Sequence, residues 1–341
     1  MSRLRDLECP VVGAPMAGGV STPSLVAAVS EAGGLGMLAA GYRTPEQLAA
    51  DIADTEDRTR LPFGVNLFVP HRLDRAGLEP AVTAYREALL AVAEPLGVAP
   101  GEPVWGDTDH WADKVALVEA WAPPVVSCTF GVPEPEVVAR WKSVGCEVHV
   151  TATSAAEALA AEAAGADVLI LQGREAGAHR GTHDPQAAPE PIDHLGLLAG
   201  VAPGTDLPLV AAGGITTAGD VRRARDAGAT AVQVGTALLL TPESGASPTY
   251  RAALRDPGLT ERVVTRAFSG RPAGAGRNGF VDSFDAIAPP AFPVIDQLTK
   301  PVRAAAARSG DVHGIHIWAG VGWRACREVP AADVVRALAD S

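Results

Sequence analysis

The sequence predicts a (β/α)8 barrel, the α/β fold in which eight parallel strands alternate with helices. Short apolar runs recur along the chain, and most are continuously apolar, as expected for parallel strands that are covered on both faces. Between them lie segments rich in Ala, Val and Leu that begin with a capping residue and end near a glycine. Eight such repeats favour a closed barrel over a doubly wound open sheet.

The predicted strands and helices alternate in chain order. The strands cover residues 10–16, 35–40, 63–69, 125–130, 147–151, 168–171, 209–212 and 231–239. Three helices are predicted to begin at Thr44, Ser154 and Thr217, the first two with the Gln or Glu of a capping box. Glycines stand where helices should end in a residue with positive φ, namely Gly33, Gly145, Gly165 and Gly228.

The regular spacing fails in two segments. The proline-rich residues 70–121 are predicted to be an insertion after the third strand, with a helix over 81–93. After residue 241 we expect a turn at 242–245, a helix over 249–255, a flexible basic loop over 269–279 and an amphipathic helix over 330–341. Because no low-complexity linker divides the chain, the prediction is a single domain, 1–341, whose segment 242–341 covers the barrel.

Composition and charge limit the classes of partner. Hydrophobic residues make up 47% and charged residues 20% of the 341 residues, which is typical of a soluble globular protein. The formal net charge of −12 disfavours nucleic acid and anionic membranes as partners. The four cysteines are isolated, and we find no apolar leader and no apolar run of about 18 residues, so we expect a cytoplasmic protein. The sequence leaves homo-oligomerisation open.

A polar, glycine-rich loop over residues 172–183 follows the apolar strand 168–171. Buried polar groups cost free energy unless partners satisfy them, so this loop is the first candidate for chemistry. His179 is a candidate general base at the end of the barrel where active sites lie, and a surface loop histidine is the alternative. His179 and His183 have the spacing of a zinc helix, but Gly181 disfavours a helix there, so no metal site is predicted.

Glycines follow the last two predicted strands. Gly213 and Gly214 come after the seventh, and Gly235 with Thr236 comes at the eighth. In a (β/α)8 barrel these two loops present bare N–H groups that bind a phosphate. The alternative is that the glycines only form tight turns.

Three amide side chains stand on apolar strands, namely Asn66, Gln172 and Gln233. Converging amides suit the edge of a flat heteroaromatic ring, which offers donors and acceptors. The alternative is core amides that neighbouring backbone groups satisfy. A phosphate and a heterocycle together fit flavin mononucleotide (FMN).

Six segments carry a family resemblance: APMAGGVST at 14–22, GGLG at 33–36, GVNLF at 64–68, EAGAHRG at 175–181, AGGI at 212–215 and QVGT at 233–236. In this order they resemble the nitronate monooxygenase family, formerly called 2-nitropropane dioxygenases, and specifically its larger class. The resemblance extends from about residue 10 to residue 327.

The resemblance implies an FMN-containing (β/α)8 barrel that oxidises alkyl nitronates with O2 to a carbonyl compound and nitrite. It implies that FMN is bound by Met16, Asn66, Gln172, Gly177, Gly214, Gln233, Val234, Gly235 and Thr236, with Met16 against the ring. It also implies that His179 is the catalytic base, which removes the proton α to the nitro group when a neutral nitroalkane is the substrate.

Two residues depart from the pattern of the family. Ala178 replaces a usual glycine, and its methyl group beside His179 could tighten the substrate pocket. Gly274 replaces a usual arginine, which removes a cation near that loop. Two other functions stay open: an FMN- and NAD(P)H-dependent enoyl-thioester reductase, whose family shares the Glu-Ala-Gly-x-His segment, and a non-catalytic barrel that binds a phosphorylated ligand.

Overall fold

A parallel barrel forms the centre of the molecule. In the computed structural model, which describes residues 2–340, eight strands pair in parallel in the order β1-β9-β8-β6-β5-β4-β3-β2. They are β1 (Val11–Gly13), β2 (Gly36–Ala39), β3 (Phe63–Phe68), β4 (Val125–Thr129), β5 (Glu147–Ala152), β6 (Val168–Gln172), β8 (Leu209–Ala212) and β9 (Ala231–Val234). Leu35 donates to the Val11 carbonyl and accepts from the Gly13 amide, each at 2.9 Å, and these bonds close β2 onto β1. The predicted (β/α)8 barrel is confirmed.

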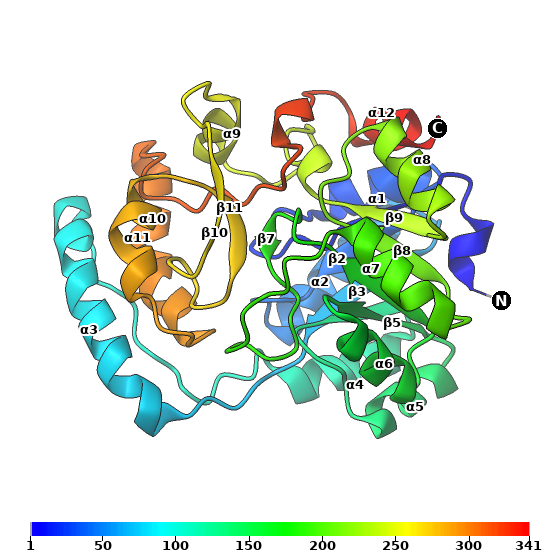
Figure 1. Ribbon diagram of the computed structural model, residues 1–341, viewed down its shortest axis with the longest axis horizontal. Coiled ribbons are helices and arrows are strands. Elements are labelled where there is room, and N and C mark those ends of the chain that lie inside the picture. The colour runs from blue at the N-terminus through cyan, green and yellow to red at the C-terminus, as the bar shows by residue number, and fades with distance from the viewer. Residues whose placement is uncertain (1, 341) are drawn as a thin grey trace.

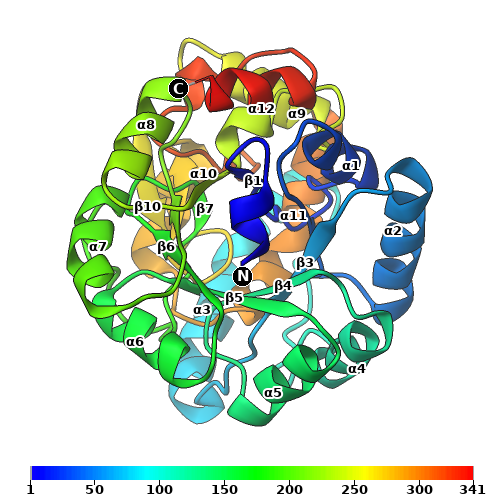
Figure 2. The same cartoon turned by 90° about the vertical axis from the view of Figure 1, so that its right-hand side faces the viewer.

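Helices surround the strands, as Figure 2 shows in a view along the barrel. They are α1 (Pro23–Glu31), α2 (Pro45–Arg58), α4 (Trp111–Trp121), α5 (Pro135–Ser143), α6 (Ala155–Ala163), α7 (His194–Val201), α8 (Ala218–Asp226) and α12 (Ala331–Ala339). Apolar side chains between this ring and the outer faces of the strands form one continuous core. The short helix η1 (Arg3–Asp6) places Leu4 among the apolar residues inside the barrel, and this closes the N-terminal end.

A second layer lies over the other end of the barrel, where the strands finish (Figure 1). It contains α3 (Arg75–Ala93), α9 (Pro248–Arg255), α10 (Gly279–Phe284) and α11 (Val294–Ser309). It also contains an antiparallel sheet in the order β10-β11-β7, formed by β10 (Arg262–Thr265), β11 (Ala273–Gly276) and β7 (Ala178–His179). Short 3-10 helices complete the chain: η2 (Glu94–Leu96), η3 (Ala202–Gly204), η4 (Thr236–Leu238), η5 (Asp285–Ile287) and η6 (Trp323–Ala325).

Most of this second layer comes from one excursion of the chain. Residues 242–330, which we call the cap segment, leave the barrel after its eighth strand, β9, and return to it at α12. Helix α12 packs against both α1 and α8, so it is the eighth helix of the ring. The predicted helix over 330–341 is therefore confirmed for the described part, but it belongs to the ring and does not cover the barrel. Ser341 lies outside the described residues, as does Met1.

The segment expected to be an insertion, residues 70–121, is divided in the structure. Its first part contains α3, which packs on α11 of the cap segment. Its last part is α4, which lies between α2 and α5 in the ring and connects β3 to β4. The part outside the barrel therefore ends before Trp111, because α4 performs the ordinary crossover between parallel strands.

The helix cap at Thr44 forms as predicted, whereas the caps at Ser154 and Thr217 differ from the prediction. Thr44 forms the predicted capping box with Gln47, whereas Ser154 accepts only from the backbone of Glu157. The Glu157 carboxylate accepts instead from the backbone N–H of Thr153 at 2.6 Å. The box absent at Ser154 is present at Thr217, where the N3 residue is an aspartate. The predicted helix-ending glycines all have positive φ, between 87° and 100°.

Two predictions about loops are wrong. The eighth strand ends at Val234 instead of residue 239, because the chain turns at Gly235 into η4. Residues 269–279 are not a flexible basic loop, since they contain β11 and the fully buried Arg271. Among the described residues, no helix is both long and apolar enough to cross a membrane.

Candidate active site

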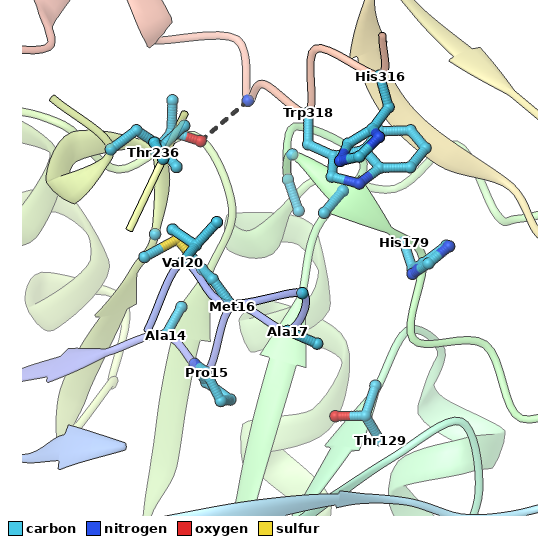
Figure 3. A pocket seen from close by; sticks show the side chains of 18 of the residues that line it. Ala14, Pro15, Met16, Ala17, Val20, Thr129, His179, Thr236, His316 and Trp318 are labelled. Carbon is cyan, nitrogen blue, oxygen red and sulfur yellow. Dashed lines mark hydrogen bonds between the residues drawn. The ribbon is translucent and has the colours of Figure 1, made fainter. Parts of the chain in front are cut away.

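A cavity of about 450 Å3 lies between the barrel and the cap segment, where the parallel strands end (Figure 3). This volume is within the usual range for sites that bind small molecules and cofactors. The structure brings all of the predicted site residues to its wall: Met16, Asn66, Gln172, Gly177, His179, Gly214, Gln233, Val234, Gly235 and Thr236. These residues come from five different strand ends, so the fold alone unites them.

One end of the cavity is a cradle of glycines. Gly213 and Gly214 have φ of 107° and 71°, which L side chains rarely adopt. A Cβ on Gly214 would lie 2.8 Å from the Cβ of Glu175, so the backbone there is accessible only because the residue is glycine. Thr236 accepts a hydrogen bond from the Gly320 N–H at 3.0 Å, which leaves its hydroxyl proton for another acceptor (Figure 3). A small anion fits this set of donors.

The cap segment adds further glycines to this cradle, beside those that follow β8 and β9, and the sequence did not predict them. Gly320 and Gly322 line the cavity, and the Val321 N–H donates to the Glu175 carbonyl at 3.1 Å. A Cβ on Gly177 would meet the backbone at Gly320, so glycine at both positions permits the close approach. The run Gly-x-Gly at 320–322 was the available signal, but nothing in the sequence placed it beside the barrel.

The three predicted amides face different surroundings. The Asn66 amide donates to the hydroxyls of Ser127 at 2.9 Å and Thr129 at 3.0 Å. Gln172 holds the loop after β6, because it donates to the His179 carbonyl at 3.1 Å and accepts from the Gly181 N–H at 2.9 Å. Gln233 lies at the end of β9 on the cavity wall.

Met16 belongs to the loop after β1. Its backbone N–H donates to the Ser21 hydroxyl at 2.9 Å, which fixes the loop. Its sulfur lies within 3.4 Å of the position that a Cβ would take on Gly235, so Met16 packs against the cradle (Figure 3).

The loop that carries His179 is held by guanidinium groups, which form no salt bridge within the described residues. Arg180 donates to the carbonyls of Gln172 and Gly173, and Arg271 donates to that of Thr182 at 2.6 Å. These bonds satisfy carbonyls that a buried loop would otherwise leave without partners. The sequence showed both arginines but not which groups they bind.

Arg262 takes the space beside Gly274. Its Nη2 donates to the carbonyls of Arg174 at 3.1 Å and Ala176 at 2.5 Å, and its Nε donates to that of Ala319 at 2.9 Å. A Cβ on Gly274 would overlap this guanidinium. Gly274 itself provides no cation, as expected, but Arg262 of β10 places a guanidinium beside the loop from the neighbouring strand.

Ala178 has a left-handed backbone, with φ of 58°. It pairs with Gly274 across β7 and β11, and this pairing holds the conformation that glycine would adopt without strain. The residue lines the cavity beside His179, as expected of a methyl group at this position.

His179 lies on the cavity wall, near Trp318 in Figure 3, and aromatic rings surround its imidazole. The ring centres of Phe130, Phe292 and Trp318 lie 5.6, 5.3 and 5.5 Å from that of its imidazole. Burial, with the charges of Arg271 and Arg303, lowers the pKa of His179 to about 3. The imidazole is therefore neutral at physiological pH.

The partners of the two loop histidines differ. His179 Nε2 lies 2.8 Å from the Ser269 hydroxyl, whereas His183 Nε2 lies 2.8 Å from the Thr151 carbonyl. His179 faces the cavity and is not the surface loop histidine of the alternative interpretation.

Several residues of the cavity wall were missed from the sequence. Tyr42 follows β2, and its buried hydroxyl has no partner among the described residues. Its place just after a barrel strand was a usable signal. Arg303, His316 and Trp318 come from the cap segment, where no periodic pattern marked them.

Comparisons with known proteins find one family that this chain resembles over its full length. The sequence profile of one family, described as nitronate monooxygenase, matches residues 1–341. A nitronate monooxygenase from Pseudomonas aeruginosa is 38% identical over 99% of this chain and 97% of its own. A probable nitronate monooxygenase from Staphylococcus saprophyticus is 37% identical over 93% and 90% of the two chains.

Solved structures give the same likeness. A nitroalkane oxidase from Streptomyces ansochromogenes is 45% identical, with a TM-score of 0.95 over 99% of this chain and 97% of that one. FabK from Thermotoga maritima is more distant, with 26% identity and a TM-score of 0.75 over 99% and 94% of the two chains.

Proposed function

Because the chain belongs to the nitronate monooxygenase family, a family of flavin-dependent oxidoreductases, we propose that it uses FMN to oxidise alkyl nitronates with O2 to a carbonyl compound and nitrite. The observation that carries this proposal is that one cavity holds both the glycine cradle and the neutral imidazole of His179. The cradle suits a phosphate, and the amides beyond it suit a heteroaromatic ring.

The residues present fit FMN. Backbone N–H groups at Gly214, Gly235 and Thr236 would hold its phosphate, and the positive φ of Gly214 leaves room for that approach. Asn66 and Gln233 would face the ring, and Met16 would lie against it. When bound, FMN supplies electron transfer between the nitronate and O2.

His179 is proposed to act only on neutral nitroalkanes. The Ser269 hydroxyl lies 3.4 Å from the Arg271 carbonyl, to which it donates its proton, so its oxygen is free to accept from His179. We therefore assign the proton of His179 to Nε2, which donates to Ser269, and this leaves the lone pair of the neutral ring on Nδ1. His179 Nδ1 removes the proton α to the nitro group, and the resulting anion and imidazolium stabilise each other. A preformed nitronate needs no such step. Tyr42, Phe68 and Phe130 would contact the alkyl part of the substrate.

The test is a pair of substrates on one variant. His179→Asn is expected to lose turnover of nitroethane by about 10²–10⁴-fold, the usual contribution of a general base, and to retain turnover of ethyl nitronate. His313→Asn, an exposed histidine outside the cavity, is the matched control and should act on both substrates like the wild type. Equal losses on both substrates by His179→Asn would contradict the assignment of the base.

An anaerobic experiment separates the other functions. Reduction of the bound flavin by ethyl nitronate supports the proposal. Reduction by NAD(P)H alone would favour the enoyl-thioester reductase. Purified protein that takes up no flavin would favour a non-catalytic barrel. Mass spectrometry of the released cofactor decides whether the flavin is FMN.

A further inference from the structure

A second histidine, His316, lies on the wall of the same cavity (Figure 3). Its ring centre is 5.0 Å from that of Trp318, and the Trp318 ring is 5.5 Å from His179. The two histidines therefore line one side of the cavity with the indole between them. His316 belongs to the cap segment, whereas His179 belongs to the loop after β6.

The tautomer of His316 follows from its partner. Arg303 Nη1 lies 2.9 Å from His316 Nδ1. A guanidinium has only donors and stays protonated, so Nδ1 must be the acceptor and the proton of the neutral ring must be on Nε2. Arg303 is itself fixed, because it donates to Asp296 Oδ1 at 2.6 Å and to the Thr299 hydroxyl at 3.0 Å.

The same contact prevents His316 from acting as a base. An imidazolium would direct an N–H from Nδ1 against the N–H of Arg303, and burial with this charge lowers the pKa of His316 well below its usual value. Among residues 2–340, no hydrogen bond reaches its Nε2. His316 thus presents a permanent N–H donor that the protein does not use.

We propose that His316 donates a hydrogen bond from Nε2 to an oxygen of the bound nitro or nitronate group. The proposal rests on the proposed function and adds a substrate contact to it. When His179 removes the proton, the electron pair of the C–H bond forms the C=N bond and negative charge moves to the nitro oxygens. A neutral donor held in place before the reaction stabilises that charge, and Arg303 behind the ring polarises it.

Kinetics on two variants test the contact. His316→Phe keeps an aromatic ring but removes the donor, and it should lower kcat/KM for nitroethane by about 10²–10³-fold, as loss of one such donor does. His316→Gln retains an N–H and should recover part of that loss. Flavin content of each purified variant should equal that of the wild type.

Two measurements do not depend on turnover. Nitrate, a planar anion with oxygens like those of a nitronate, should perturb the flavin spectrum of the wild type and bind at least about tenfold more weakly to His316→Phe, one decade corresponding to about 1.4 kcal/mol. Nitrogen-15 NMR of the wild-type holoenzyme should show His316 protonated at Nε2 without titration between about pH 5 and 9.

Each outcome decides the proposal. Wild-type kcat/KM and nitrate affinity in His316→Phe would overturn it, as would an Nδ1 proton or a titration near neutral pH. If His316→Phe loses flavin, the NMR result on the wild type decides alone. If the wild type does not oxidise nitronates, the proposed function fails, while nitrate binding and the tautomer still test His316.

Discussion

Burial is the main cause of the low pKa of His179, and the charge of Arg271 is expected to lower that pKa further, which Arg271→Met tests. The guanidinium carbon lies 4.0 Å from the centre of the Phe130 ring, which is 5.6 Å from that of His179, so the charge and the imidazole are within about 10 Å. At an effective dielectric constant of about 20, unit charges at that distance interact by about 1.7 kcal/mol. Because Arg271 disfavours the imidazolium, its removal should raise the pKa of His179 from about 3 by roughly one unit.

Histidine NMR titration of the two holoenzymes measures this change. Arg277→Met is the matched control, since Arg277 is an exposed arginine of the same segment that pairs with Asp282 and Glu261. It should leave the pKa of His179 unchanged. An unchanged or lower pKa of His179 in Arg271→Met would refute the reasoning.

The low pKa of His179 in the folded protein also makes stability depend on pH. The folded pKa of His179 lies below the value of about 6.5 for an unfolded chain, so the unfolded state binds the proton first. The free energy of unfolding that this group contributes is therefore present above pH 6.5 and is lost as the pH falls towards 3. Arg271→Met should reduce that acid-side loss by about 1 kcal/mol near pH 3, as denaturant unfolding at pH 8 and pH 3 would show.

Two further substitutions test the backbone of the site. Ala178→Gly removes the strain of a left-handed alanine, about 1–2 kcal/mol, but adds about 0.5–1 kcal/mol of unfolded-state entropy. Urea unfolding should therefore show a free energy of unfolding that rises by up to about 1.5 kcal/mol and does not fall. Gly214→Ala places a Cβ 2.8 Å from that of Glu175 at a φ of 71°, and it should weaken FMN binding to the apoprotein at least about tenfold in a fluorescence titration. Gly200→Ala, in α7 with open space around its Cβ position, should keep wild-type affinity, and equal affinities in all three proteins would contradict the cradle.

The barrel was predictable because its signal is local and repeated. Continuous apolar runs, N-caps and glycines with positive φ each constrain a few neighbouring residues, and the eight parallel strands follow from them. Boundaries failed where a short helix replaced the end of a run, as at Gly235. The ring position of α12 was not predictable, because a helix that follows an excursion of some ninety residues reads like any terminal helix.

That the predicted residues line one cavity was predictable for a similar reason. Asn66, Gly214 and Thr236 stand at strand ends, and a barrel brings all strand ends of one polarity together. Arg271 shows the opposite case. Its sequence neighbours are glycine, proline and alanine, so it reads as a charge in a mobile loop, whereas the fold buries it against Phe130 and the Thr182 carbonyl.

This contrast divides the cavity between two parts of the chain. The barrel loops contribute the amides and most of the glycine cradle, which suit a cofactor. The cap segment contributes Ser269, which lies within hydrogen-bond distance of His179, and also Arg303 and His316, which line the same cavity. A change within residues 242–330 can therefore alter the substrate without touching the strand ends that would hold FMN. Arg262 shows that the cap segment also holds the loop that carries His179. Its guanidinium occupies the space beside Gly274 and donates to the loop carbonyls of Arg174 and Ala176. It follows that substrate preference in relatives of this fold is better compared through contacts made by the cap segment than through the motifs at the strand ends.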